Sequence, residues 1–175
     1  MNEINFKTLL PGIKLMVFDV DGVLTDGSVL CFNDGEQIRN MNIKDGYALQ
    51  LAIKKNIRIL IISGGRSEAV IKRLNMLGVT DIFMSVQHKL PVLIQYLFEF
   101  GINPNEVLYM GDDIPDLECL KYVAAATCPA DAAHDIKNVC NYVSHELGGR
   151  GCVRDVIEQV LRAQKMWLDA DAHTW

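Results

Sequence analysis

The stretch that decides the fold runs Lys14-Leu-Met-Val-Phe-Asp19-Val-Asp21-Gly22. Its four consecutive apolar residues, at positions 15–18, indicate a short strand that is buried on both faces, as strands of parallel sheets are. Two carboxylates follow directly after the strand, and Gly22 lets the chain turn there. Because ligands of open parallel sheets bind beyond the carboxyl ends of the strands, Asp19 and Asp21 are candidates for chemistry.

The remainder of the chain repeats this pattern of a short apolar run followed by a segment of helical period. We expect further strands at 57–62, 81–85 and 106–111, with weaker ones at 122–127 and 141–143. The expected helices cover 45–55, 67–77, 90–100, a segment that starts near Pro115, 130–139 and 153–166. Strand–helix–strand units of ~30 residues predict an α/β fold, namely a doubly wound, Rossmann-like parallel sheet with helices on both faces. We expect residues 1–175 to form one domain.

Two segments depart from this alternation. Residues 28–42 contain Asn33-Asp-Gly35 between two potential strands, which predicts a β-hairpin inserted after the first strand. The other segment, 167–175, loses helical periodicity, so we expect a tail that is either mobile or ordered by a partner. The apolar residues of the hairpin, which are expected to be exposed unless a neighbouring molecule covers them, are Leu30, Phe32, Ile38 and Met41.

Composition and charge exclude several classes of protein. Of the 175 residues, 50% are hydrophobic and 22% are charged, which excludes a disordered chain, and the net charge of −5 argues against nucleic-acid binding. No run approaches the ~18–20 apolar residues of a membrane span, and residues 1–14 do not resemble a secretory signal. The five cysteines form no Cys-x-x-Cys pair, which is typical of reduced thiols. We therefore expect a cytoplasmic protein that binds neither nucleic acid nor a membrane.

Polar residues follow the other expected strands as well. Ser63 and Gly64 come after the second strand, Lys89 follows the third, and the run 111–113 with Asp116 follows the fourth. The topology of a doubly wound sheet brings such strand ends together. Three or more carboxylates in one place repel one another unless a cation binds, and an all-oxygen set suits Mg²⁺. The sequence therefore predicts a Mg²⁺ site; aspartates that merely cap turns and helices are the alternative.

Anion-binding groups accompany these carboxylates. Ser63 and the glycines after it could hold phosphate oxygens through a hydroxyl and backbone N–H groups, aided by the start of the next helix, and Lys89 could neutralise the charge. Arg66 and Arg73 are seven positions apart, and hence on one face of that helix. Both could bind an anionic part of a substrate, although a solvated surface is the alternative for Arg73.

Together these residues resemble the four motifs of the haloacid dehalogenase superfamily of phosphatases, in the family's order and along most of the chain. The first motif matches Asp19-Val-Asp-Gly-Val-Leu-Thr-Asp-Gly27, and the fourth matches residues 111–116. The resemblance implies that Asp19 takes the phosphoryl group as an aspartyl-phosphate and that Asp21 serves as general acid and base. It further implies Mg²⁺ ligands at Asp19, Asp21 (through its backbone carbonyl) and Asp112, phosphate-binding groups at Ser63, Gly64 and Lys89, and orienting roles for Asp113 and Asp116.

The long first motif, the hairpin and Gly148-Gly-Arg150-Gly151 resemble members that lack a cap domain and act on sugar-acid phosphates. They imply hydrolysis of the 8-phosphate of KDO (3-deoxy-D-manno-octulosonate), an eight-carbon acid on the route to a lipopolysaccharide sugar. A nine-carbon 9-phosphate of the sialic-acid type is the alternative substrate. Arg66, Arg73 and Arg150 are the candidates for contact with the sugar acid.

The resemblance also implies how the molecule assembles. Without a cap, an open site would discriminate poorly among phosphate esters. In the family resembled, hairpins of four subunits form a homotetramer in which a neighbouring subunit covers each site. Two other classes of function stay open: a signalling receiver domain, which the Asp-x-Asp opening disfavours, and a catalytically silent interaction module, which the intact motifs disfavour.

Overall fold

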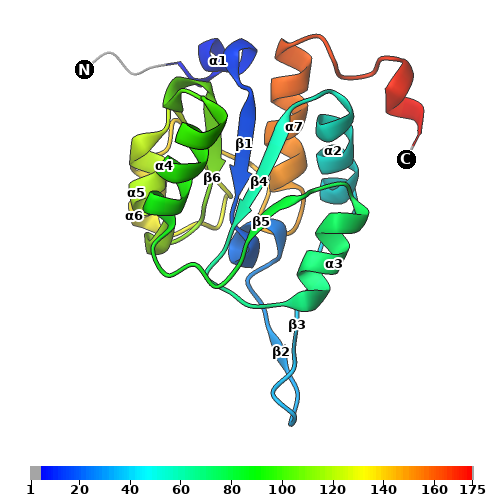
Figure 1. The fold of residues 1–175 in the computed structure, drawn as a ribbon, viewed down its shortest axis with the longest axis vertical. Coiled ribbons are helices and arrows are strands. Elements are labelled where there is room, and N and C mark those ends of the chain that lie inside the picture. Colours follow the sequence, from blue (N-terminus) through cyan, green and yellow to red (C-terminus); the bar gives the residue numbers. More distant parts are fainter. Residues whose placement is uncertain (1–4, 175) are drawn as a thin grey trace.

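A computed structural model describes residues 5–174, which fold around one six-stranded sheet in which every pairing is parallel (Figure 1). The strand order is β5-β4-β1-β6-β7-β8, so the chain winds from the centre to one edge and then from the centre to the other. This confirms the predicted doubly wound α/β fold. The strands are β1 (Leu15–Phe18), β4 (Arg58–Ile62), β5 (Asp81–Phe83), β6 (Val107–Met110), β7 (Ala125–Cys128) and β8 (Tyr142–Val143).

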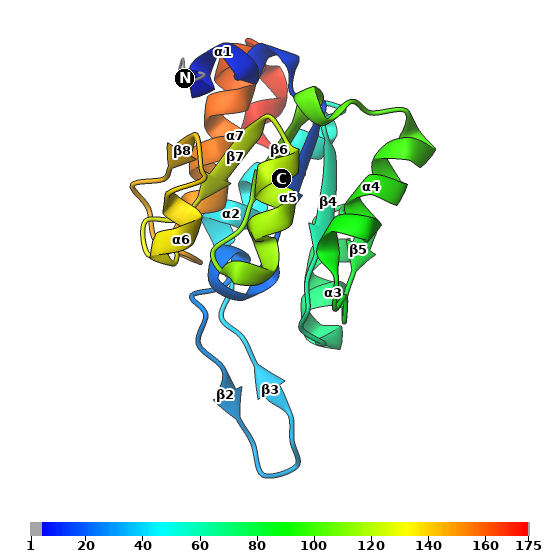
Figure 2. The same cartoon turned by 90° about the vertical axis from the view of Figure 1, so that its left-hand side faces the viewer.

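Helices cover both faces of the sheet (Figures 1 and 2). One face carries α2 (Ile43–Lys54), α3 (Glu68–Met76) and α7 (Cys152–Ala163). The other carries α4 (Lys89–Phe100), α5 (Leu117–Tyr122) and α6 (His134–Lys137). The remaining helical pieces are α1 (Phe6–Leu9) and the short helical turns Leu10–Gly12, Val20–Leu24, Pro104–Glu106, Ile114–Asp116 and Ala170–His173.

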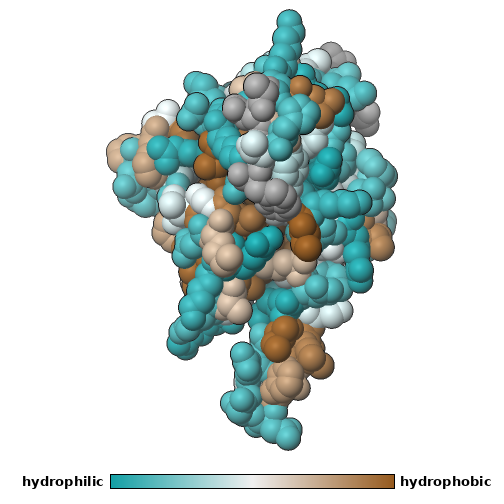
Figure 3. Space-filling view, turned by 90° about the vertical axis from the view of Figure 1, so that its right-hand side faces the viewer, coloured by the Kyte–Doolittle hydropathy of each residue, from teal (hydrophilic) through white to brown (hydrophobic). Residues whose placement is uncertain are grey.

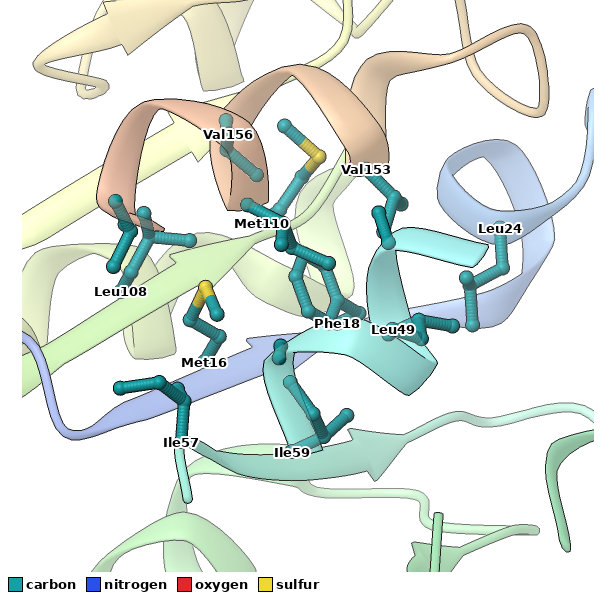
Figure 4. Packing of buried hydrophobic residues seen from close by; sticks show 14 of the residues in the cluster. Met16, Phe18, Leu24, Leu49, Ile57, Ile59, Leu108, Met110, Val153 and Val156 are labelled. Carbon is teal, nitrogen blue, oxygen red and sulfur yellow. The ribbon is translucent and has the colours of Figure 1, made fainter. Parts of the chain in front are cut away.

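Strand β1 is the centre of two separate hydrophobic clusters. Successive side chains of a strand point to opposite faces, so Met16 and Phe18 join the cluster under α2 and α7 (Figure 4), whereas Leu15 and Val17 join the one under α4 and α5. All four side chains are fully buried, as the unbroken apolar run predicted. Anchored on both faces, β1 holds the start of the following loop in a fixed place.

Several element boundaries differ from the prediction. Helix α2 begins at Ile43 because the side chain of Asn42 caps it by accepting from the backbone of Lys44. The helix predicted over 130–139 is wrong in extent and keeps only His134–Lys137, since the backbone N–H of Ala133, which the longer helix would need for its first internal hydrogen bond, donates to the carbonyl of Asp112 instead. Helix α1, which the sequence analysis missed, packs through Phe6, whose ring stacks on Tyr142 with centroids 4.7 Å apart.

The predicted hairpin is present and projects from the carboxyl-end side of the sheet (Figure 2). Its strands are β2 (Leu30–Cys31) and β3 (Gln37–Ile38), and a bridge between Thr25 and Met41 closes its base. Leu30, Phe32 and Ile38 are 61%, 47% and 47% exposed and contribute to the apolar patch on the projecting arm (Figure 3). The exposure expected for Met41 is wrong, because its side chain packs against the α2–α7 cluster.

The C-terminal segment packs on its own chain over the part described, 167–174. Trp167 is buried, and the hydroxyl of Tyr47 on α2 donates to the backbone carbonyl of Ala172 at 2.5 Å. Lys54 Nζ also donates to the carbonyl of Thr174 at 2.9 Å. Helix α2 of the same chain thus contacts this segment, and its mobility or dependence on a partner stays a prediction; Trp175 lies outside the described residues. Among residues 5–174, none of the helices has the length and apolarity needed to cross a bilayer.

Asp45 is a buried carboxylate that joins the two helices over one face. It is 1% exposed on α2, and its Oδ1 accepts from the backbone N–H of Arg154 in the first turn of α7 at 2.7 Å. The residue that precedes α7 is Gly151, which has no side chain to cap the helix, so Asp45 supplies the cap from outside. Its other oxygen, Oδ2, is buried and has no hydrogen-bond partner among the described residues.

We expect Asp45→Asn to change how stability depends on pH. Burial raises the pKa of Asp45 to about 6, and the backbone N–H groups of Arg154 and Gly151 offset this only in part. Since the folded-state pKa exceeds the unfolded one, the folded form binds more protons between roughly pH 4 and 6, and this residue's contribution to stability falls as the pH rises through that window. The free energy of unfolding of D45N relative to wild type should therefore increase by up to about 3 kcal/mol from about pH 4 to about 7.5.

Urea unfolding at the two pH values measures this difference. Asp135→Asn, at an exposed position of α6, is the matched control and should show the same offset from wild type at both. Contributions from other buried carboxylates cancel because they are common to both proteins. An offset of D45N that does not change with pH would contradict the prediction.

Candidate active site

The carboxyl ends of β1, β4, β5 and β6 border a cavity of about 550 Å³. Each end is followed by a loop that delivers polar groups, as the sequence pattern predicts. The residues that line the cavity are Asp19, Asp21, Gly22, Gly27, Ser63, Gly64, Gly65, Val86, Gln87, Lys89, Asp112, Asp113, Pro115 and Asp116. The residues predicted to act as nucleophile, as acid and base, and as phosphate and metal ligands thus lie around one cavity. They come from segments up to about a hundred positions apart in the chain.

Lys89 is the central cation of this cavity. It is the first residue of α4 and only 4% exposed, and its Nζ lies 3.0 Å from Asp19 Oδ1 and 2.7 Å from Asp116 Oδ1. Burial alone lowers the pKa of Lys89, but the charges of Asp19 and Asp116 outweigh it, so the pKa lies above its usual value. The ammonium is therefore charged whenever the site can work.

Asp116 accepts hydrogen bonds on both of its carboxylate oxygens. Its Oδ1 accepts from Lys89 and, at 2.6 Å, from the buried hydroxyl of Tyr109 on β6, while its Oδ2 accepts from the backbone N–H of Asp112 at 3.3 Å. Both oxygens are thus engaged within the protein, and the orienting role of Asp116 stays a prediction. Tyr109 was not predicted from the sequence, where its only signal is a hydroxyl in an otherwise apolar strand.

The remaining carboxylates fit a hard divalent cation. Oxygens of Asp19, Asp112 and Asp116 lie within 4.8 Å of one another. Burial, followed by the charge of Asp116, raises the pKa of Asp19 to about 6, and burial with the charges of Asp19 and Asp116 raises that of Asp112 to about 7. Apart from its ion pair with Lys89, the buried Asp19 Oδ1 has no hydrogen-bond partner among the described residues. The repulsion among these carboxylates is what a bound Mg²⁺ would relieve.

Of the three clustered carboxylates, Asp19 and Asp112 are the stronger candidates for metal ligands, because both oxygens of Asp116 already accept hydrogen bonds. Gly22 makes room for this arrangement: it has a φ of +85°, and a Cβ there would stand 2.0 Å from Asp112 Oδ2. The side chain of Asp21 is not in the cluster; its predicted metal contact is through the backbone carbonyl, which stays a prediction.

The loop that is expected to bind phosphate follows β4 and lines the cavity, and phosphate binding by its residues stays a prediction. Ser63 is 1% exposed and its Oγ accepts from the backbone N–H of Gly65 at 3.1 Å, so the hydroxyl proton can be donated elsewhere. Helix α3 begins at Glu68, and the side chain of Ser67 caps it by accepting from Val70. The expected help from this helix N-terminus is therefore weak, since four residues separate it from Ser63.

The three candidate arginines do not share one place. Arg66 and Arg73 line a second cavity, of about 660 Å³, between α3 and the hairpin. Arg150 lines neither that cavity nor the one holding Asp19; its guanidinium lies 3.2 Å from Asp26 Oδ2, in a separate hollow beside α7. Its predicted contact with a substrate stays a prediction.

A residue of the hairpin that the sequence analysis did not single out enters the site. Arg39 donates through Nε to Asp21 Oδ1 at 2.6 Å and through a terminal nitrogen to Asp21 Oδ2 at 3.2 Å. Arg39 also lines the second cavity, so it stands between the two. Nothing in the local pattern indicates this pairing, which joins positions 18 apart across a turn.

Comparisons with known proteins agree with this geometry. No family model matches the chain. The chain is 36% identical over 157 residues to the 3-deoxy-D-manno-octulosonate 8-phosphate phosphatase of Salmonella typhi, covering 90% of this chain and 84% of that protein.

Solved structures of proteins with the same name are similar as well. The one from Yersinia pestis has a TM-score of 0.90 at 33% identity and covers 93% of this chain and 88% of its own. The one from Moraxella catarrhalis, in complex with magnesium, phosphate and KDO, has a TM-score of 0.89 at 31% identity, with 91% and 92% covered. On this identity and coverage, and with the motif residues gathered around one cavity, the chain belongs to the 3-deoxy-D-manno-octulosonate 8-phosphate phosphatase family of the haloacid dehalogenase superfamily.

Proposed function

We propose that this protein is a Mg²⁺-dependent phosphatase that hydrolyses KDO 8-phosphate to KDO and inorganic phosphate. The observation that carries the proposal is the cluster of Asp19, Lys89 and Asp112 at the strand ends, in a chain 36% identical to phosphatases named for this substrate. Because those relatives carry the name of the eight-carbon substrate, it is preferred over a nine-carbon 9-phosphate.

The reaction begins with phosphoryl transfer to Asp19. A carboxylate oxygen of Asp19 attacks phosphorus, the bond to the sugar oxygen breaks, and Asp21 protonates that oxygen as it leaves. Water then attacks the aspartyl-phosphate, gives up a proton to Asp21, and releases phosphate and the free Asp19 carboxylate. Two easier displacements replace one difficult one.

The surrounding groups hold the phosphoryl oxygens and balance charge. Ser63 and the backbone of Gly64 donate to the oxygens, and the nearly buried ammonium of Lys89 neutralises the developing charge. Asp19 and Asp112, with the backbone carbonyl of Asp21, would hold Mg²⁺, which supplies further charge neutralisation on the phosphate when bound. Asp113 and Asp116 orient this arrangement.

The second cavity is the place for the sugar acid. It carries Arg66 and Arg73, whose guanidinium groups suit a carboxylate, and it adjoins Asp21 through Arg39. In a homotetramer, Arg150 of a neighbouring copy could reach the substrate, and the exposed apolar arm formed by Leu30, Phe32 and Ile38 would be buried between copies. One domain per chain and a cytoplasmic location, where its free cysteines stay reduced, complete the proposal.

A panel of phosphate esters tests the function on one purified sample. We expect release of phosphate from KDO 8-phosphate in Mg²⁺, with kcat/KM at least about tenfold above that for a nine-carbon 9-phosphate or a hexose phosphate. EDTA should abolish turnover, and returning Mg²⁺ should restore it. A higher kcat/KM for the nine-carbon ester would show that this ester, and not KDO 8-phosphate, is the substrate. Turnover that survives EDTA would show that the reaction does not require Mg²⁺.

A further inference from the structure

Arg39 is a hairpin residue whose side chain turns back toward the catalytic cavity and contacts Asp21, which lines that cavity. Its guanidinium makes two hydrogen bonds to the two oxygens of Asp21, at 2.6 and 3.2 Å. Such a bidentate pair fixes the orientation of a carboxylate as well as its position, which a single contact would leave free to rotate. The hairpin therefore takes part in the geometry of the site in addition to carrying an apolar arm.

The pair is built into the fold. Although the arm around it is exposed, the side chain of Arg39 is only 5% exposed. Gly65 supplies the space: a Cβ there would stand 2.8 Å from Asp21 Oδ2 and 3.4 Å from an Arg39 terminal nitrogen. The loop after β4, which contains Gly65, thus leaves room for the ion pair between Arg39 and Asp21.

The base of the hairpin gives Arg39 a firm support. Two residues after it, Met41 pairs with Thr25 and packs against the core, and Thr25 is itself fully buried in the loop that carries Asp21. The guanidinium also approaches the carbonyl of Gln37 at 3.5 Å, across the hairpin strand. The bridge at the base of the hairpin therefore lies close in sequence to both Arg39 and Asp21 and holds their two segments together.

We propose that Arg39 is a positioning residue that holds Asp21 as the general base for hydrolysis of the aspartyl-phosphate. The inference rests on the proposed function. In that step a water oxygen bonds to phosphorus, the bond between phosphorus and the Asp19 oxygen breaks with its electron pair returning to Asp19, and one water proton passes to an Asp21 oxygen. Arg39 keeps its own protons and acts only by orienting the oxygen that accepts.

The test uses p-nitrophenyl phosphate, whose leaving group needs no proton, so that only the second step depends on Asp21. We expect Arg39→Ala to lower kcat by about tenfold or more while kcat/KM, which reports phosphoryl transfer, stays within about threefold. A burst of p-nitrophenolate near one per active site should precede the slow steady state, since the phosphoenzyme accumulates. Arg39→Lys keeps the positive charge but has a single nitrogen in place of the two that contact Asp21, so its kcat should fall between. Asn40→Ala, at the exposed next position, should match wild type.

Other outcomes have distinct meanings. Equal losses in kcat and kcat/KM without a burst, or no loss at all, would overturn the proposal. A rise in kcat would also overturn it, since Arg39 would then be holding Asp21 away from the reaction. A raised KM for KDO 8-phosphate alone would assign Arg39 to the substrate instead. If the wild-type enzyme with Mg²⁺ cleaves none of these esters, the proposed function itself fails. Thermal unfolding of each variant checks that the fold is retained.

Discussion

Asp19→Asn is expected to abolish phosphatase turnover, by roughly 10⁴-fold or more, while leaving the protein at least as stable as wild type. An amide nitrogen or oxygen cannot replace the carboxylate as nucleophile, so no aspartyl-phosphate forms. The same change removes a buried charge whose burial raises the pKa of Asp19 to about 6 and which repels Asp112 and Asp116. Loss of function with retained or increased stability is typical of a site whose charges serve chemistry.

Two measurements check this pair of effects. Phosphate release from p-nitrophenyl phosphate in Mg²⁺ gives the activity, and urea unfolding in EDTA gives the stability without the metal. Asp135→Asn is the matched control, because it makes the same chemical change at an exposed position. Turnover by D19N within about tenfold of wild type would show that another residue is the nucleophile.

Lys89→Met is expected to have the second-largest effect, because it removes the cation between two buried carboxylates. Nζ lies 3.0 Å from Asp19 and 2.7 Å from Asp116, and all three groups are nearly inaccessible to water. Breaking a buried ion pair by removing one partner costs about 3–5 kcal/mol, since the remaining charge stays uncompensated. We expect that loss in urea unfolding in EDTA, together with a loss of activity on the order of 10³-fold.

Mg²⁺ should restore part of the stability of K89M but little of its activity. A cation bound by Asp19 and Asp112 stabilises the folded form in proportion to its occupancy, whereas the phosphate still lacks the ammonium. Lys121→Met, at an exposed position of α5, is the control and should shift stability by less than about 0.5 kcal/mol. If K89M were as stable as wild type in EDTA, the ion pairs at Lys89 would contribute nothing to the fold.

Local sequence patterns determined the architecture of this protein. A run of apolar residues at 15–18 is buried on both faces, and alternating strands and helices can close only as a parallel sheet whose carboxyl ends face one side. The residues after those ends were therefore predictable as neighbours. Hairpin and turn residues were also readable, because Asn-Asp-Gly specifies a local turn.

Element lengths were less predictable where tertiary contacts compete with local preference. The helix expected over 130–139 is shortened because the backbone N–H of Ala133 donates to the carbonyl of Asp112, in the loop after β6, and not to a carbonyl of its own segment. The segment after Trp167 lacks periodicity and yet packs on its own chain, where Tyr47 and Lys54 on α2 donate to its carbonyl groups. The sequence of the segment itself gives no indication of these contacts with Tyr47 and Lys54.

What only the tertiary structure decided is how the charges pair. The motifs place five aspartates at the strand ends. They do not predict that Asp116 accepts hydrogen bonds from Lys89 and Tyr109, or that Asp21 accepts one from Arg39. Nor do they separate Arg150, which binds Asp26, from Arg66 and Arg73. The physical reason is that periodicity reports which face of an element is buried. Ion pairs between distant residues depend on side-chain directions and on the space left by glycines such as Gly22 and Gly65, and those exist only once the chain has folded.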